Sequence, residues 1–232
     1  EDQLAAHHGL ARSEPVSSET APPARTVEPT VRREPAPVRE SGTAEPIAIV
    51  GMAGSFPGCD SLDSFWNALV EGRDLTREVP SARWRWQDWF GDPQKDVNKT
   101  RVNNGGFLAE VDGFDAAFFG ISPREAELMD PQHRLFLETV WHALEDAGIR
   151  PKSLGGTQVG VFVGIASQDY KEILGENGIN IDAYAATGMA HCLAANRVSY
   201  LLDLQGPSEA IDTACSSSLV AVHRGLEALR DG

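Results

Sequence analysis

The sequence is poor in positive charge and in cysteine, and each shortage excludes classes of protein. It has 20 Lys and Arg residues against 34 Asp and Glu residues, a formal net charge of −14 over 232 residues. A surface this acidic repels phosphate backbones and anionic headgroups, so we expect neither nucleic acid nor a membrane as a partner. The three cysteines, Cys59, Cys192 and Cys215, are odd in number and form no CxxC pair. This spacing favours a reducing compartment over a disulfide framework.

Long apolar runs are also absent. No stretch approaches the roughly 20 apolar residues that span a bilayer, and residues 1–8 lack the basic-then-apolar order of a signal peptide. We therefore expect a cytoplasmic protein. Hydrophobic residues make up 41% of the chain, which suffices for one α/β core or for part of a larger one.

Aromatic residues are missing from the first 46 positions, which hold seven of the 14 prolines. Such a segment cannot bury enough surface to offset the entropy lost on ordering. We expect a disordered, Pro-rich interdomain linker over 1–44 and an ordered domain over 45–232. The alternative is a fragment boundary without a biological role.

Strand-like and helix-like segments alternate after this point, which predicts an α/β layered fold. Short β-branched runs ending in glycine predict buried strands at 47–51 and 159–164. Apolar periodicity and end signals predict helices over three ranges, 62–71, 130–147 and 190–202.

Motifs for metal, nucleotide and hydrolase chemistry are absent. His133 and His142 are nine positions apart, HExxH does not occur, and we expect both to be structural histidines with satisfied partners and no metal site. The glycine-rich stretch 51–58 lacks the Gly-Lys-Ser/Thr of a P-loop. No cysteine lies in the surroundings typical of cysteine hydrolases.

The segment 206–219 contains the candidate nucleophile, Cys215. We expect a short strand over 208–212 and then a helix whose buried face carries Leu219, Val222, Leu226 and Leu229. A thiol at a helix N-terminus faces unpaired N–H groups and the positive end of the helix dipole, which favour the thiolate. The same N–H groups can act as oxyanion donors. The alternative is an inert, buried cysteine.

The other two cysteines differ from Cys215 in their expected setting. Cys59 follows Pro-Gly in a loop, and Cys192 lies in an apolar-rich segment. We therefore expect neither thiol to be as reactive as that of Cys215.

Several blocks of sequence, taken together, resemble the β-ketoacyl synthases of polyketide synthases. The resemblance runs from Glu45 to the end of the chain, and DTACSSS at 212–218 matches the nucleophile motif of that family. The other matching blocks lie at 45–53, 107–115, 118–126, 129–134 and 195–200.

The resemblance implies a thiolase-like layered fold (α-β-α-β-α), of which this chain holds the N-terminal half, in an obligate homodimer beside neighbouring synthase domains. It implies that Cys215 takes an acyl chain from the phosphopantetheine arm of an acyl carrier protein, with no cofactor bound directly. Decarboxylative Claisen condensation with a malonyl-type extender follows. Two histidines and a lysine of the family's later half have no counterpart here, so we expect the segment alone not to condense.

The resemblance also indicates substrate contacts. Met189, His191, Cys192 and Ala214 are the residues we expect to line the acyl pocket. The stretches 208–211 and 222–224 resemble synthases served by a free-standing acyltransferase. The alternative function is a non-elongating or fragmentary ketosynthase that only relays acyl chains or serves as a scaffold.

Overall fold

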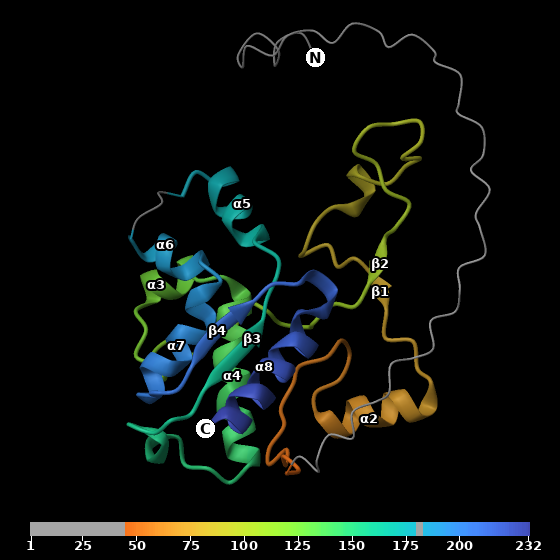
Figure 1. The fold of residues 1–232 in the computed structure, drawn as a ribbon. Coiled ribbons are helices and arrows are strands. Elements are labelled where there is room, and N and C mark those ends of the chain that lie inside the picture. Colours follow the sequence, from red (N-terminus) through yellow and green to blue (C-terminus); the bar gives the residue numbers. More distant parts are fainter. Residues whose placement is uncertain (1–44, 180–182) are drawn as a thin grey trace, which may run out of the picture. The chain divides into compact units, whose positions relative to one another are not determined.

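A computed structural model describes residues 45–179 and 183–232, so the linker predicted over 1–44 lies outside the described residues. Figure 1 shows how the elements are arranged. In chain order they are α2 (Leu62–Glu71), β1 (Arg77–Glu78), η1 (Trp86–Asp88), β2 (Asn104–Gly105), α3 (Pro123–Leu128), α4 (Pro131–Asp146), η2 (Pro151–Leu154), β3 (Val161–Gly164), α5 (Asp169–Glu176), α6 (Ala183–Met189), α7 (Cys192–Leu202), β4 (Ser208–Ile211), η3 (Ala214–Ser216) and α8 (Ser217–Asp231).

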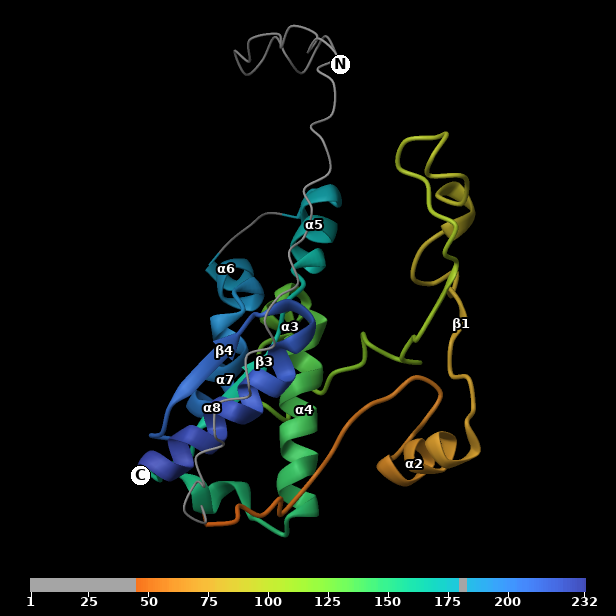
Figure 2. The same ribbon diagram turned by 45° about the vertical axis from the view of Figure 1, so that its right-hand side comes forward.

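The central layer is a pair of parallel strands, β3 and β4, in register from Val161 opposite Ser208 to Gly164 opposite Ile211. Successive side chains of a strand point to opposite faces. Val163 faces a core to which α7 contributes, whereas Gly164 lies against the first turn of α8. The two helices therefore cover opposite faces of the strand pair (Figures 1 and 2).

The core lies between the strand pair, α7 and α4. Its members include Met129, Leu137, Val163, Ala195 and Val198, all buried. A second, smaller cluster of buried residues joins α3, α5 and α6 through Leu128, Leu174, Ala185 and Met189. The core thus fixes α7 and the two strands that lead to the candidate site.

The helices predicted at 62–71, 130–147 and 190–202 are confirmed as α2, α4 and α7. Ser61 begins α2 with a capping box to Ser64, and Gly72 ends it in the left-handed region (φ 64°). The side chain of Asp130 caps α4 by accepting from the backbone N–H of Gln132. The local end signals therefore placed α2 and α4 correctly, whereas α7 begins at Cys192, two residues after the predicted start.

The strand predicted over 47–51 is wrong. The segment is extended and pairs with no strand in the described part of the chain, and the side chain of Ile49 is 81% exposed. A strand requires a neighbouring backbone for its hydrogen bonds, and an apolar run alone does not supply one. Instead, the backbone N–H of Met52 donates to the Asp146 side chain at the end of α4 (2.9 Å).

The buried face predicted for α8 is also wrong. Leu219, Val222 and Leu229 are mostly exposed and Leu226 is half-buried, whereas Ser217 and Ala221 are buried. The first turn of the helix lies so close to Gly164 of β3 that no side chain larger than a hydrogen fits at that position, whereas farther along the helix Phe162 packs against Gly225.

No helix in the described ranges is both long and apolar enough to cross a bilayer. No group of three or more His, Cys, Asp or Glu side chains in the same ranges is arranged to hold a metal ion.

Candidate active site

The candidate nucleophile lies in the tight turn between β4 and α8. Cys215 is the middle residue of η3, and its side chain is exposed. The residue before it, Ala214, has a φ of 54°, which a residue with a Cβ adopts only at a cost on the order of 1 kcal/mol. The backbone N–H of Ala214 donates to Oδ1 of Asp212 (2.9 Å), which helps to hold this conformation.

Hydroxyl groups hold the rest of the turn. The Oγ of Ser217, a buried residue, accepts from the backbone N–H of Thr213 (2.9 Å) and donates to the carbonyl of Ala214 (2.7 Å). Ser216 Oγ donates to the carbonyl of Thr213 (2.9 Å) and lies 2.8 Å from the Thr213 hydroxyl. These bonds fix the backbone on both sides of Cys215.

The turn places Cys215 directly before the N-terminus of α8, a helix of 15 residues. The positive end of the helix dipole therefore lies close to the thiol. Among the described residues, no hydrogen bond uses the backbone N–H of Cys215. The arrangement combines an exposed thiol with a backbone donor at the same residue, which suits attack on a carbonyl carbon.

The structure divides the predicted site residues into two groups. Ala214 shares the turn with Cys215, whereas Met189, His191 and Cys192 lie where α6 passes into α7. Met189 is buried in the smaller cluster, and Nε2 of His191 donates to the backbone carbonyl of Ser167 (2.9 Å). No hydrogen bond in the described ranges links one group to the other.

The expected contrast among the cysteines needs a correction. Cys59 is buried, but Cys192 is exposed and is the first residue of α7. It therefore also faces the positive end of a helix, a setting predicted for Cys215 alone. The sequence argument failed because it treated 190–202 as uniformly apolar and did not locate the helix start.

The histidines also differ from expectation. His142 pairs with Glu145 on the surface (3.1 Å). His133 is 1% exposed, and neither ring nitrogen has a hydrogen-bond partner in the described part of the chain, so it is structural but not satisfied. Burial, together with the charges of Arg197 and His191 and against that of Asp130, lowers the pKa of His133 to about 4.

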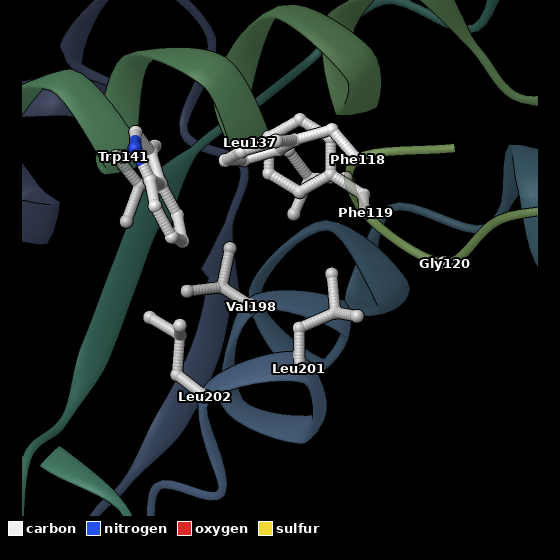
Figure 3. A pocket seen from close by; sticks show the side chains of 9 residues that line it. Phe118, Phe119, Gly120, Leu137, Trp141, Val198, Leu201 and Leu202 are labelled. Atoms are coloured by element: carbon white, nitrogen blue, oxygen red, sulfur yellow. The ribbon is translucent and has the colours of Figure 1, made fainter. Parts of the chain in front are cut away.

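Two hollows lie near α7. A cavity of about 250 Å³ between α4 and α7 is lined by apolar side chains, among them Leu137, Trp141 and Val198 (Figure 3). An open hollow of about 450 Å³ is lined in part by Thr187, Leu193 and Asn196. None of the predicted site residues lines either hollow.

Sequence reasoning missed Asp212, Ser216 and Ser217 as parts of the site. Their signal was present, because a run of short hydroxyl and carboxylate side chains around a nucleophile is able to bond the local backbone.

A sequence-family model described as "Beta-ketoacyl synthase, N-terminal domain" matches residues 44–232. The chain belongs to the β-ketoacyl synthase family. It is 48% identical over 198 residues to "Polyketide synthase PksN" of Bacillus subtilis, covering 85% of this chain and 4% of that protein. It is 52% identical over 186 residues to "Polyketide synthase ThaG" of Burkholderia thailandensis, covering 80% of this chain and 3% of that protein.

The fold of this chain resembles the folds of solved ketosynthase structures. The oxazolomycin ketosynthase domain OzmH KS7 of Streptomyces albus JA3453 superposes with a TM-score of 0.72 at 44% identity, over 79% of this chain and 32% of that one. The ketosynthase from module 6 of the bacillaene synthase of Bacillus subtilis 168 gives 0.68 at 38% identity, over 79% and 29%. The predicted α/β, thiolase-like class is therefore confirmed. This member of the β-ketoacyl synthase family spans about a third of the solved chains.

Proposed function

We propose that this chain supplies the nucleophile of a polyketide ketosynthase, and that Cys215 carries the acyl chain between transfer and condensation. The observation that supports this most directly is the turn itself. An exposed thiol lies at the start of a long helix, beside a backbone N–H without a partner in the described residues. The family and its polyketide synthase relatives supply the substrate class.

The first step is acyl transfer. The Cys215 thiolate attacks the carbonyl carbon of a thioester on the phosphopantetheine arm of an acyl carrier protein, and a new C–S bond forms. The backbone N–H of Cys215 stabilises the tetrahedral oxyanion. Collapse of the intermediate breaks the original C–S bond, and the carrier thiol leaves and takes up a proton. Covalent catalysis thus separates acyl selection from carbon–carbon bond formation.

The second step is condensation. A malonyl-type extender on a carrier protein loses CO₂, and the resulting enolate attacks the acyl carbonyl on Cys215. The product is a β-ketoacyl thioester on the carrier, and the cysteine sulfur is released. In the described part of the chain, no side chain is hydrogen-bonded to Cys215 that could assist decarboxylation. We propose this step, the homodimer and the neighbouring synthase domains for a whole ketosynthase domain; the chain spans about a third of the solved ketosynthase chains.

A cytoplasmic location is part of the same proposal. All three cysteines are free, which suits a reducing compartment. The arrangement of the acyltransferase stays a prediction from the sequence.

Acyl transfer can be measured by mass spectrometry of the intact protein and its peptides after incubation with a carrier-bound or small acyl thioester. We expect the label on Cys215, its loss in Cys215→Ala, and labelling slower by roughly a thousandfold or more in Cys215→Ser. Cys192→Ala is the matched control and should label like the unmodified protein. A label on Cys192, or undiminished labelling in Cys215→Ala, would contradict the proposal. If a polypeptide that covers a whole ketosynthase domain is acylated but does not condense, the result would favour the alternative function, a non-elongating ketosynthase that only relays acyl chains.

A further inference from the structure

Two side chains from distant parts of the sequence meet at one backbone oxygen. The carbonyl oxygen of Ser167 accepts from Nε2 of Gln132 (2.8 Å) and from Nε2 of His191 (2.9 Å), residues 35 and 24 positions away. We call these three residues the Ser167 junction. Because a carbonyl can only accept, Nε2 of His191 carries the hydrogen. The junction joins the first turn of α4, the loop after β3 and the start of α7.

The Gln132 donor is itself held in place. Its Nε2 lies 3.3 Å from each carboxylate oxygen of Asp130, a residue that is 3% exposed. The backbone N–H of Asp130 donates to the carbonyl of Gly188, near the end of α6 (2.9 Å). The side chain of Gln132 is thus oriented by the buried carboxylate of Asp130, a residue whose backbone N–H also connects α4 to α6.

The loop at the junction lies at the same edge of the strand pair as the nucleophile turn. Residues 165–168 follow the carboxyl end of β3, and the Cys215 turn follows the carboxyl end of β4 (Figure 1). The two exits are bonded together, because the backbone N–H of Ile165 donates to the carbonyl of Ile211 (3.1 Å). In α/β proteins, ligands bind outside the carboxyl ends of parallel strands.

Burial holds only the first residue of this loop, Ile165, which is 7% exposed and belongs to the main core. Ala166, Ser167 and Gln168 are all exposed in the structure. The side-chain hydrogen bonds to the Ser167 carbonyl therefore contribute more to the position of these three residues than they would in a loop that is buried by packing.

We propose that Gln132 and His191 are positioning residues that hold the Ser167 carbonyl, and that loop 165–168 thereby forms a wall beside the acyl group carried on Cys215. The inference rests on the proposed function and deepens it, because it assigns acyl-chain selectivity to residues that do not touch the thiol. In this proposal His191 acts through the loop, and its place in the lining of the acyl pocket stays a prediction from the sequence.

The test compares variants that remove one donor each. Gln132→Glu keeps the shape but places an acceptor opposite the carbonyl, and His191→Phe keeps the ring but removes the donor. His191→Gln is the rescue variant, since its amide nitrogen can reach where Nε2 lies. His142→Phe, on the exposed face of α4, is the control.

The readout is competition between a straight-chain and a branched acyl thioester for Cys215. We expect each donor variant to change the ratio of the two products by about fivefold, the effect of one hydrogen bond, with restoration in His191→Gln. The double variant should change the ratio no more than the larger single change, because both donors act on one oxygen. Alkylation of Cys215 by iodoacetamide should proceed at the unmodified rate. A ratio that stays constant in the donor variants, or equal slowing of both thioesters, would overturn the assignment of selectivity.

Hydrogen exchange measured on a peptide covering residues 165–168 tests the junction without any acyl transfer. We expect faster exchange in Gln132→Glu and His191→Phe and the unmodified rate in His142→Phe. Exchange that is unchanged in both donor variants would refute the junction itself, even where Cys215 accepts acyl groups. Faster exchange in a protein whose Cys215 is never acylated would instead support the junction and refute the proposed function.

Discussion

At the scale of single residues, Gly164 determines how closely α8 can lie on β3. A Cβ at this position would lie 2.6 Å from the backbone nitrogen of Ser218 and 2.7 Å from the carbonyl carbon of Ser217. These are backbone atoms of the first helical turn and cannot move aside as a flexible side chain would. Gly164→Ala should therefore displace the turn that carries Cys215, destabilise the fold by about 1–3 kcal/mol and slow acylation roughly a hundredfold.

The matched control for this substitution lies on the facing helix. A Cβ at Gly225 would meet only Phe162, at an ordinary 3.5 Å. Gly225→Ala should keep the acylation rate and raise stability slightly, because alanine favours a helix. Acylation rates and thermal unfolding of both variants provide the comparison. Equal acylation rates in the two variants would show that the close approach at Gly164 does not position the nucleophile.

The buried His133 should make stability depend on pH. Its pKa falls from 6.5 to about 4 in the folded protein, so between these values the unfolded chain binds a proton that the folded chain does not. Stability should be full above about pH 6.5 and decline as the pH falls toward 4. The total loss from this group is on the order of 3 kcal/mol or less.

This pH dependence can be measured as the melting temperature between pH 4 and 7. His133→Leu removes the titrating group and should flatten the decline. His142→Gln, on the exposed face of α4, should leave the decline unchanged. If the melting temperature of His133→Leu declines in the same way, groups other than His133 cause the pH dependence.

At the scale of elements, the start of α8 depends on one buried hydroxyl. Ser217 is 5% exposed and bonds the backbone of both Thr213 and Ala214, whereas the neighbouring Ser218 is exposed. Ser217→Ala leaves the backbone N–H of Thr213 unpaired, whereas the carbonyl of Ala214 still accepts from the backbone N–H of residue 217; the loss should cost about 1–3 kcal/mol and slow acylation. Ser218→Ala is the control, and thermal unfolding checks both. Equal stability of the two variants would contradict this role for Ser217.

Elements with local signals were predictable from the sequence. The caps at Ser61 and Gly72 and the Asp-Pro start at Asp130 lie within one turn of the helices that they delimit. The prediction of a strand over 47–51 failed because a strand depends on a hydrogen-bonding neighbour strand elsewhere in the chain. The short helices α3, α5 and α6 had no sequence prediction, since each is only about two turns long and too short to show a repeated apolar period.

Within the candidate site, the sequence predicted the turn that holds Ala214 and the candidate nucleophile Cys215. The motif around Cys215 placed the thiol at a helix start, and the structure agrees. The packing of α8 could not be read from its apolar period, because close approach at Gly164 selects small residues and leaves Leu219 exposed. The Ser167 junction depends on contacts between residues 24 and 35 positions apart, which no local pattern encodes.

At the scale of the whole molecule, two helices present apolar side chains that nothing in the described residues covers. On α2, the side chain of Trp66 is 66% exposed. On α8, the exposed fractions are 77% for Leu219, 60% for Val222 and 68% for Leu229. Contiguous apolar surface of this kind is a site of association between proteins or of aggregation.

We therefore expect the 232-residue chain alone to bind a hydrophobic dye and to self-associate or unfold in part. Replacing Leu219, Val222 and Leu229 together by Gln should reduce dye fluorescence and association, because it removes the apolar stripe while Gln retains good helix propensity. Glu227→Gln with Arg230→Gln, on the same helix, changes polar positions only and should leave both signals unchanged. Dye fluorescence and analytical ultracentrifugation provide the measurements. A monomeric chain that unfolds cooperatively and binds no dye would contradict the expectation, since its exposed helix faces would then be compatible with an independently stable fold.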